Sequence, residues 1–190
     1  MSSSSIVVLV VVILALGYGV VLYNGLVNLK HGVSKAWSNI DVLLKQRHDE
    51  LPKLVETCKQ YMTHERTTLE QVIAARSAVA SAREQGDVPA LGKAETGLRM
   101  GLGQLFALAE NYPELKANES FRHLAERITG LENGIADRRE LYNDAVNRNN
   151  VRIEQFPDVL IAKWFAFKAA DLLQFSDAEK ADVDMAKLFG

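Results

Sequence analysis

The sequence IVVLVVVILALGYGVVLY, residues Ile6 to Tyr23, decides the fold of this chain. It contains no charged side chain and no Asn, Gln or His, and the uncharged run continues to Leu29. A helix needs about 20 apolar residues to cross a bilayer core. Soluble domains seldom contain a helix that is apolar on every face, and a lone strand cannot satisfy its backbone in lipid. The run therefore predicts a transmembrane helix.

A cleaved signal peptide is the main alternative for this segment. Such a peptide begins with basic residues, but Met1 to Ser5 carry no charged side chain. Residues 15–17, Ala-Leu-Gly, resemble a cleavage site only weakly, and the apolar run continues past them. We therefore expect an uncleaved anchor. Lys30 and Lys35 follow the span and no basic residue precedes it, so the positive-inside rule predicts an outside N-terminus and a cytoplasmic C-terminal part.

The composition fits one helical domain behind this anchor. The chain has 190 residues, is 48% hydrophobic and carries a formal net charge of −2. The balance of charge gives no indication of nucleic-acid binding. The single cysteine, Cys58, excludes an intramolecular disulfide and fits a reducing compartment. Its place in a helical pattern predicts a small core residue.

Apolar residues recur every three or four positions after the span and predict long helices. The first helix leaves the membrane and runs to about Arg47, and Leu51-Pro52 predicts an interruption. The second helix then runs from Pro52 to about Gln85, with Gly86 as its C-terminal cap.

Asp87 is the expected N-cap of a third helix, which ends before Tyr112-Pro113. Gly97 and Gly101 lie four residues apart inside that helix. Glycine is costly in a helix, so we expect another helix to pack closely at both positions.

A fourth helix has the clearest pattern, closed by Pro157. Four of its residues, Leu124, Ile128, Leu131 and Ile135, are expected in the core. The tail Val159 to Phe175 is apolar but charged enough not to be a second span, and Ser176 to Glu179 predict the start of a short last helix. The whole seam comprises Phe121, Leu124, Ile128, Leu131, Ile135, Tyr142, Val146, Ile153 and Phe156.

These patterns predict an all-α fold. A transmembrane anchor (1–25) continues into an antiparallel bundle of about four long, coiled-coil-like helices (26–157), followed by a helical C-terminal tail (158–190). No strand pattern is present in the sequence.

Motifs for catalysis or metal binding are not found in the sequence. No histidine follows a glutamate by three positions, which a ferritin-like di-iron site requires. His64-Glu65 begins like a zinc-protease motif, but Thr68 stands where the second histidine is needed. We therefore predict a non-enzymatic protein with no catalytic, cofactor-binding or metal-binding residues and no cofactor.

Polar residues on the fourth helix have an ordinary interpretation. Asn147 and Asn149 are expected on a solvated face. Arg138-Arg139 with Glu132 and Glu140 are expected to form surface ion pairs.

The chain resembles the LemA family from about Tyr23 to Pro157. It departs from the family pattern at Lys53, where an asparagine is usual, and in a longer tail with a more acidic end. The matching motifs are Tyr23-Asn24-x-Leu26-Val27, Trp37-x-x-Ile40-Asp41-x-x-Leu44-Lys45-x-Arg47-x-Asp49, Leu51-Pro52-x-Leu54-Val55, His64-Glu65, Ala109-Glu110-x-Tyr112-Pro113-x-Leu115-Lys116-Ala117-Asn118, Phe121, Glu132-Asn133-x-Ile135-Ala136, Arg138, Tyr142-Asn143-x-x-Val146, Asn150 and Phe156-Pro157.

This resemblance implies a bacterial membrane protein with one N-terminal span and a mostly helical cytoplasmic domain. It implies no reaction, and fold alone does not define a function. We expect a scaffold or adaptor in the bacterial inner membrane, with the lipid bilayer and an unidentified membrane or cytoplasmic protein as partners.

Three further expectations remain open at this stage. One alternative is a module that binds a small ligand or metal through Asp41, Arg47, Asp49, His64 or Glu65. Another is an accessory subunit of a membrane protease or envelope-stress system. The third concerns the seam of the first helix, which predicts homo-oligomers unless the bundle covers it within one chain. That seam consists of Leu29, Val33, Trp37, Ile40 and Leu44.

Overall fold

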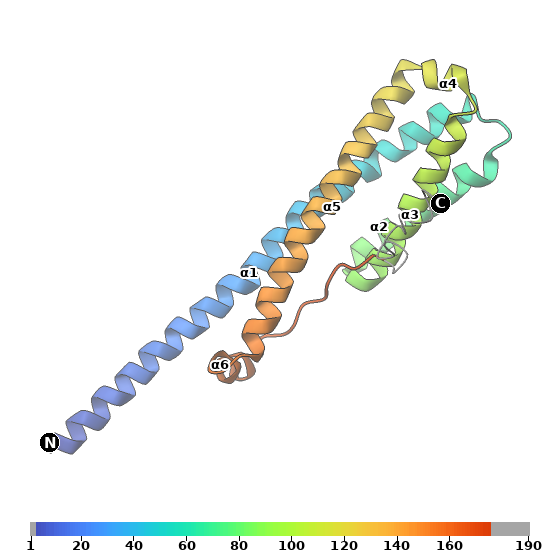
Figure 1. Cartoon of the computed structure of the whole chain (residues 1–190). Helices are drawn as coiled ribbons and strands as arrows, with labels where there is room; N and C mark the ends of the chain where they lie inside the picture. The colour runs from blue at the N-terminus through green and yellow to red at the C-terminus, as the bar shows by residue number, and fades with distance from the viewer. Residues whose placement is uncertain (1–2, 176–190) are drawn as a thin grey trace, which may run out of the picture. The chain divides into compact units, whose positions relative to one another are not determined.

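The computed structural model describes residues 3–175, and within that range it is all α-helical (Figure 1). Four helices are long and two are short, which confirms the predicted fold class. They are α1 (Ser3–Lys59), α2 (Arg66–Gln85), α3 (Val88–Ala109), α4 (Pro113–Ala117), α5 (Glu119–Glu154) and α6 (Asp158–Trp164). The last helix predicted from residue 176 onward lies outside the described residues.

The chain forms two compact units. Within the described residues, the first consists of residues 3–40 with Arg138–Leu172, and the second of Asp41–Asp137 with residues 173–175. The helices α1 and α5 contribute residues to both units.

The predicted interruption at Leu51-Pro52 is wrong, because α1 continues through Pro52 to Lys59. Proline lacks the N–H that would bond to the carbonyl oxygen four residues earlier, which here belongs to His48. That oxygen accepts a hydrogen bond from Arg76 Nε on α2 instead, at 3.0 Å. A neighbouring side chain thus satisfies the acceptor that Pro52 leaves unpaired.

The second helix consequently begins later than predicted, at Arg66 rather than at Pro52. The turn before it is fixed by packing: Met62 is fully buried, and its N–H bonds to the carbonyl oxygen of Cys58 at 2.8 Å. The hydroxyl of Tyr61 accepts a hydrogen bond from Asn118.

The helix caps follow the sequence prediction. Gly86 ends α2 in the left-handed region, with φ of 67°, where a side chain is unfavourable. Asp87 caps α3, and its side chain accepts from the backbone N–H of Ala90 at 2.9 Å.

In the second unit, the segments of α1 and α5 that belong to it run antiparallel. Arg47 of α1 pairs with Glu132 of α5, and Glu50 further along α1 pairs with Arg127 earlier in α5. The helix α3 packs against α2, where Gly101 lies against Val72.

The close packing predicted for Gly97 and Gly101 of α3 is therefore half right. A Cβ at Gly101 would lie 3.4 Å from a methyl of Val72, but one at Gly97 would meet nothing within 4 Å.

The seam of α5 is largely confirmed. Ile128 and Ile135 are fully buried, whereas Leu124 and Leu131 are only half-buried. The prediction for Phe156 is wrong, because this residue lies two positions after the end of α5 and is 80% exposed.

Candidate functional site

The N-terminal part of α1 presents apolar side chains on every face. In the first unit, the large apolar residues from Ile6 to Val21 are each between 48% and 67% exposed. This is the one helix among residues 3–175 that is long and apolar enough to cross a membrane. A surface of this kind is compatible with lipid and unfavourable in water.

The short helix α6 packs against the same segment of α1. A Cβ at Gly19 would lie 4.0 Å from Cδ1 of Ile161 of α6, an ordinary van der Waals distance, so Ile161 lies beside Gly19. Asp158 and Ala162 are buried, and Asp158 is paired with Arg152 Nε at 2.7 Å.

The opposite face of α6 exposes large apolar side chains. Leu160 and Trp164 lie four residues apart, on one face of the helix, and Trp164 is 84% exposed. Phe156 before the helix and Phe165 after it are also exposed. We call these four residues the α6 patch.

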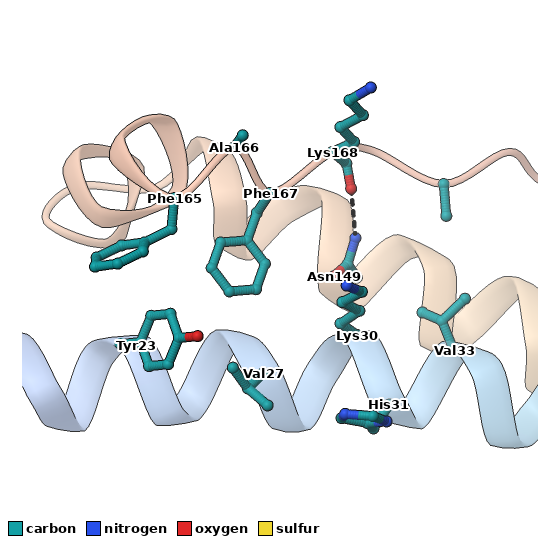
Figure 2. Close-up of a pocket in the computed structure, with 11 residues that line it drawn as sticks. Tyr23, Val27, Lys30, His31, Val33, Asn149, Phe165, Ala166, Phe167 and Lys168 are labelled. Atoms are coloured by element: carbon teal, nitrogen blue, oxygen red, sulfur yellow. Dashed lines mark hydrogen bonds between the residues drawn. The ribbon is translucent and has the colours of Figure 1, made fainter.

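An aromatic cluster joins the end of α6 to α1. The ring of Tyr23 lies 4.7 Å from that of Phe165 and 5.8 Å from that of Phe167. Figure 2 shows both phenylalanines pointing from the returning chain toward Tyr23. A pocket of about 570 Å³ adjoins this cluster, with Lys30 and Lys168 among its lining residues.

Two asparagines of α5 hold the chain after α6 in place. Asn150 accepts from the N–H of Ala170 and donates to its carbonyl oxygen, both at 2.9 Å. Asn149 donates to the carbonyl oxygen of Lys168 at 3.4 Å (Figure 2). The solvated face predicted for Asn149 is therefore wrong, because this residue is buried; Asn147 is exposed as predicted.

A second notable group lies in the second unit and contains two buried charges, Arg47 and Glu95, beside the partly exposed Glu132 and Arg99. Arg47 is 2.5 Å from Glu95 and 2.5 Å from Glu132, and Arg99 lies 3.6 Å from Glu132. Glu132, which was predicted in a surface ion pair, is only 15% exposed and pairs with the buried Arg47. Burial and the neighbouring carboxylates act in opposite directions on Arg47, and the carboxylates prevail and raise its pKa.

This charge cluster has the features of a structural element. Burial raises the pKa of Glu95, while Arg47 opposes that rise. Two arginines match two carboxylates, so the formal charges cancel within the cluster. Sequence reasoning missed Glu95, although it lies four residues after Leu91 and three before Leu98, on the apolar face of α3.

The five residues proposed as a ligand or metal site are not gathered at one place. Arg47 is buried with its carboxylates, and Asp41 is paired with Arg83. Asp49 and His64 are exposed, and Glu65 accepts from the hydroxyl of Tyr112 at 3.4 Å. No group of three or more His, Cys, Asp or Glu side chains within residues 3–175 is placed to hold a metal ion.

Cys58 is a core residue, as predicted from the sequence. It is fully buried, and burial raises the pKa of its thiol to about 12. A thiol with so high a pKa is a poor nucleophile at neutral pH.

Together these features define a class of protein: an all-α chain whose N-terminal helix is able to cross a membrane and continues into a bundle of long helices. The model of the LemA family matches residues 36–186, and the chain belongs to this family.

Curated relatives extend the comparison. The magnetosome proteins MamQ 1 and MamQ 2 of Paramagnetospirillum magneticum are each 26% identical to the chain, over 88% of its length and 70% of theirs. The magnetosome protein MamQ of Magnetospirillum gryphiswaldense is 24% identical over the same shares. The N-terminal helix and the family together are consistent with a membrane location.

Proposed function

We propose that this protein is a non-enzymatic scaffold or adaptor anchored in the bacterial inner membrane by the first part of α1. The observation that carries the proposal is the exposed apolar surface from Ile6 to Val21, which is followed directly by a helical bundle. Such an anchor confines the bundle to one membrane surface and raises its effective concentration toward membrane partners.

The same proposal includes an orientation. Lys30 and Lys35 lie just after the apolar run, so the N-terminus is outside and the bundle is in the cytoplasm. The buried Cys58 is compatible with this compartment, since a lone thiol needs no oxidising environment.

Cysteine labelling in intact cells tests the anchor and its orientation. In a Cys58→Ala background, Ser3→Cys should react with a membrane-impermeant maleimide, whereas Gln71→Cys on the exposed face of α2 should react only after lysis. Labelling of Gln71→Cys but not Ser3→Cys in intact cells would contradict the orientation. Release of the protein from membranes by alkaline extraction would contradict the anchor.

In-cell crosslinking followed by mass spectrometry tests the adaptor role. Crosslinks from exposed lysines of the bundle to one reproducible membrane or cytoplasmic protein would support it. Crosslinks that remain unchanged when the bundle is replaced by an unrelated helical domain of similar size would contradict it.

A further inference from the structure

The α6 patch is an exposed apolar feature of the first unit outside the anchor itself. Four large apolar residues, Phe156, Leu160, Trp164 and Phe165, are exposed within ten positions of sequence. Single exposed apolar residues are ordinary on protein surfaces, but a group of this size indicates a binding surface.

Contacts with α1 show where the α6 patch lies along the proposed transmembrane span. Ile161 lies beside Gly19, and the ring of Phe165 contacts that of Tyr23 in a tilted arrangement. Both partners belong to the last part of the apolar run Ile6–Tyr23, and they are about 6 Å apart along the helix axis at about 1.5 Å per residue. The contacts therefore place α6 at the C-terminal end of the proposed span.

The chemistry of the patch suits that depth. Trp is enriched at membrane–water interfaces, where its ring lies among headgroups. An interfacial helix buries its apolar face about 5–10 Å into the boundary between headgroups and acyl chains.

The charges of α6 and the residues after it also suit a position among lipid headgroups. From Val159 to Ala170 the only charged residues are Lys163 and Lys168, both exposed. The carboxylate just before them, Asp158, is buried and neutralised by Arg152. Exposed lysines at this level can reach lipid phosphates while their stems remain among apolar groups.

We propose that α6 is a second membrane contact: it lies in the headgroup region of the phospholipid bilayer, with Leu160 and Trp164 toward the acyl chains and Lys163 toward the phosphates. This inference rests on the proposed anchoring by α1. It goes further by giving the chain a fixed depth and by assigning a role to a segment after the last long helix.

The two native tryptophans provide the test. Trp37→Phe leaves Trp164 as the only tryptophan, and Trp164→Phe leaves Trp37, which lies 14 residues, or about 21 Å, beyond Tyr23 on α1. Each full-length variant is reconstituted into vesicles of phosphatidylcholine and phosphatidylglycerol, with and without phosphatidylcholine brominated near the top of its acyl chains. Flotation and alkaline extraction establish whether the protein is integrated.

The expected result is that Trp164 emission is blue-shifted, quenched by the brominated lipid and protected from acrylamide. Trp37 emission should be unaffected by the brominated lipid. In integrated protein, quenching of Trp164 by acrylamide but not by bromine would place α6 in water and overturn the inference. Protection of Trp164 from both quenchers would mean that protein covers the patch, which also overturns it.

Failure of the anchor can be told apart from failure of α6. A protein that does not float with vesicles, or that alkali extracts, contradicts the anchor and the α6 inference together. As a further measurement in the Trp37→Phe background, Leu160→Glu should reduce quenching of Trp164 by the brominated lipid. Leu141→Glu, at an equally exposed apolar site on α5, should leave it unchanged. Equal quenching in the parent and in both glutamate variants, with helix content preserved, would also contradict the inference.

Discussion

Arg47 Nη2 lies 2.5 Å from Glu95 Oε1, and neither side chain is more than 1% exposed. Burying an ion pair costs solvation energy that the pair's attraction repays only with good geometry. Here Glu132 supplies a second carboxylate 2.5 Å from Nη1 of the same guanidinium. The cluster therefore makes the packing of α1, α3 and α5 in the second unit sensitive to the loss of any one charge.

The first prediction concerns the loss of the arginine. Arg47→Met leaves Glu95 buried without its cation, so the free energy of unfolding near neutral pH should fall by about 3–5 kcal/mol. Urea unfolding of the full-length protein in detergent measures this change. A loss too small to measure would mean that water reaches Glu95.

The same variant should acquire a distinctive pH dependence. Burial raises the pKa of Glu95, and removing Arg47 removes the charge that opposes the rise. A carboxyl whose folded pKa exceeds its unfolded value of about 4.3 contributes stability below that value and loses it as pH rises through the folded pKa. The loss in free energy of unfolding caused by Arg47→Met should therefore be smallest at acidic pH and grow toward neutral pH. In the control Arg47→Met with Glu95→Gln, this dependence should disappear.

The second prediction concerns the proline inside α1. Pro52→Ala restores an N–H that can bond to the carbonyl oxygen of His48, and in a helix interior alanine is favoured over proline by up to about 3 kcal/mol. Pro52→Ala should therefore stabilise the protein. Arg76→Ala should cost about 1–2 kcal/mol, because it leaves that oxygen without its donor.

A double-mutant cycle tests whether these two effects are linked. Arg76→Ala should cost less in the Pro52→Ala background, where the helix supplies the missing donor. Equal costs in both backgrounds would show that Arg76 acts through other contacts, such as its 2.6 Å contact with the His48 ring.

The third prediction compares two of the four glycines of α3, Gly97 and Gly101. Gly97→Ala should stabilise the protein by up to about 1 kcal/mol, because alanine is a better helix former and nothing lies within 4 Å of its Cβ. Gly101→Val should destabilise it by about 1–3 kcal/mol through overpacking against Val72. Thermal unfolding followed by circular dichroism compares them, and a stabilising Gly101→Val would contradict the close packing.

The fourth prediction concerns the core face of α5. Ile128→Ala should cost about 2–5 kcal/mol, because Ile128 is fully buried. Leu131→Ala, at a half-buried position on the same helix, should cost less. If Ile128→Ala lost under about 0.5 kcal/mol, the seam would not form the core.

The fifth prediction concerns self-association through the seam of α1. Ile40 and Leu44 are buried within the chain, but Leu29, Val33 and Trp37 are only half-buried. We expect the protein to form homo-oligomers in detergent. Both Trp37→Ala and deletion of the residues before Lys30 should weaken this association. Light scattering over a tenfold range of concentration measures the mass. A monomer mass throughout, unchanged by Trp37→Ala, would contradict self-association; the contact of Trp37 with Tyr142 at 5.5 Å would then account for its role.

The sequence predicted those features that are set by local chemistry. The apolar run of α1, the caps at Gly86 and Asp87, and the buried seam through Ile128 and Ile135 depend on composition or short-range periodicity. Such features can be predicted from the local sequence without knowing the tertiary contacts.

The features that were missed depend on partners distant in sequence. Pro52 stays helical because Arg76, 24 positions later, satisfies His48. Glu95 and Asn149 receive their partners from other elements. Their positions did carry a local sign of burial, because each lies three or four residues from apolar residues on the seam of its own helix. The exposed pair Leu160 and Trp164, four apart beside Lys163, could have been noticed as an interfacial pattern.

The hydrogen bonds from Asn149 and Asn150 go to main-chain atoms of Lys168 and Ala170. Such hydrogen bonds do not depend on which side chains these residues carry, as is also true of the main-chain hydrogen bonds between strands of a sheet. These hydrogen bonds alone therefore place no restriction on the side chains at positions 168–170, except that residue 170 keeps its N–H and so is not proline. Two side-chain amides of α5 fix the course of residues 168–170. Side chains in this segment can therefore change without any change in α5.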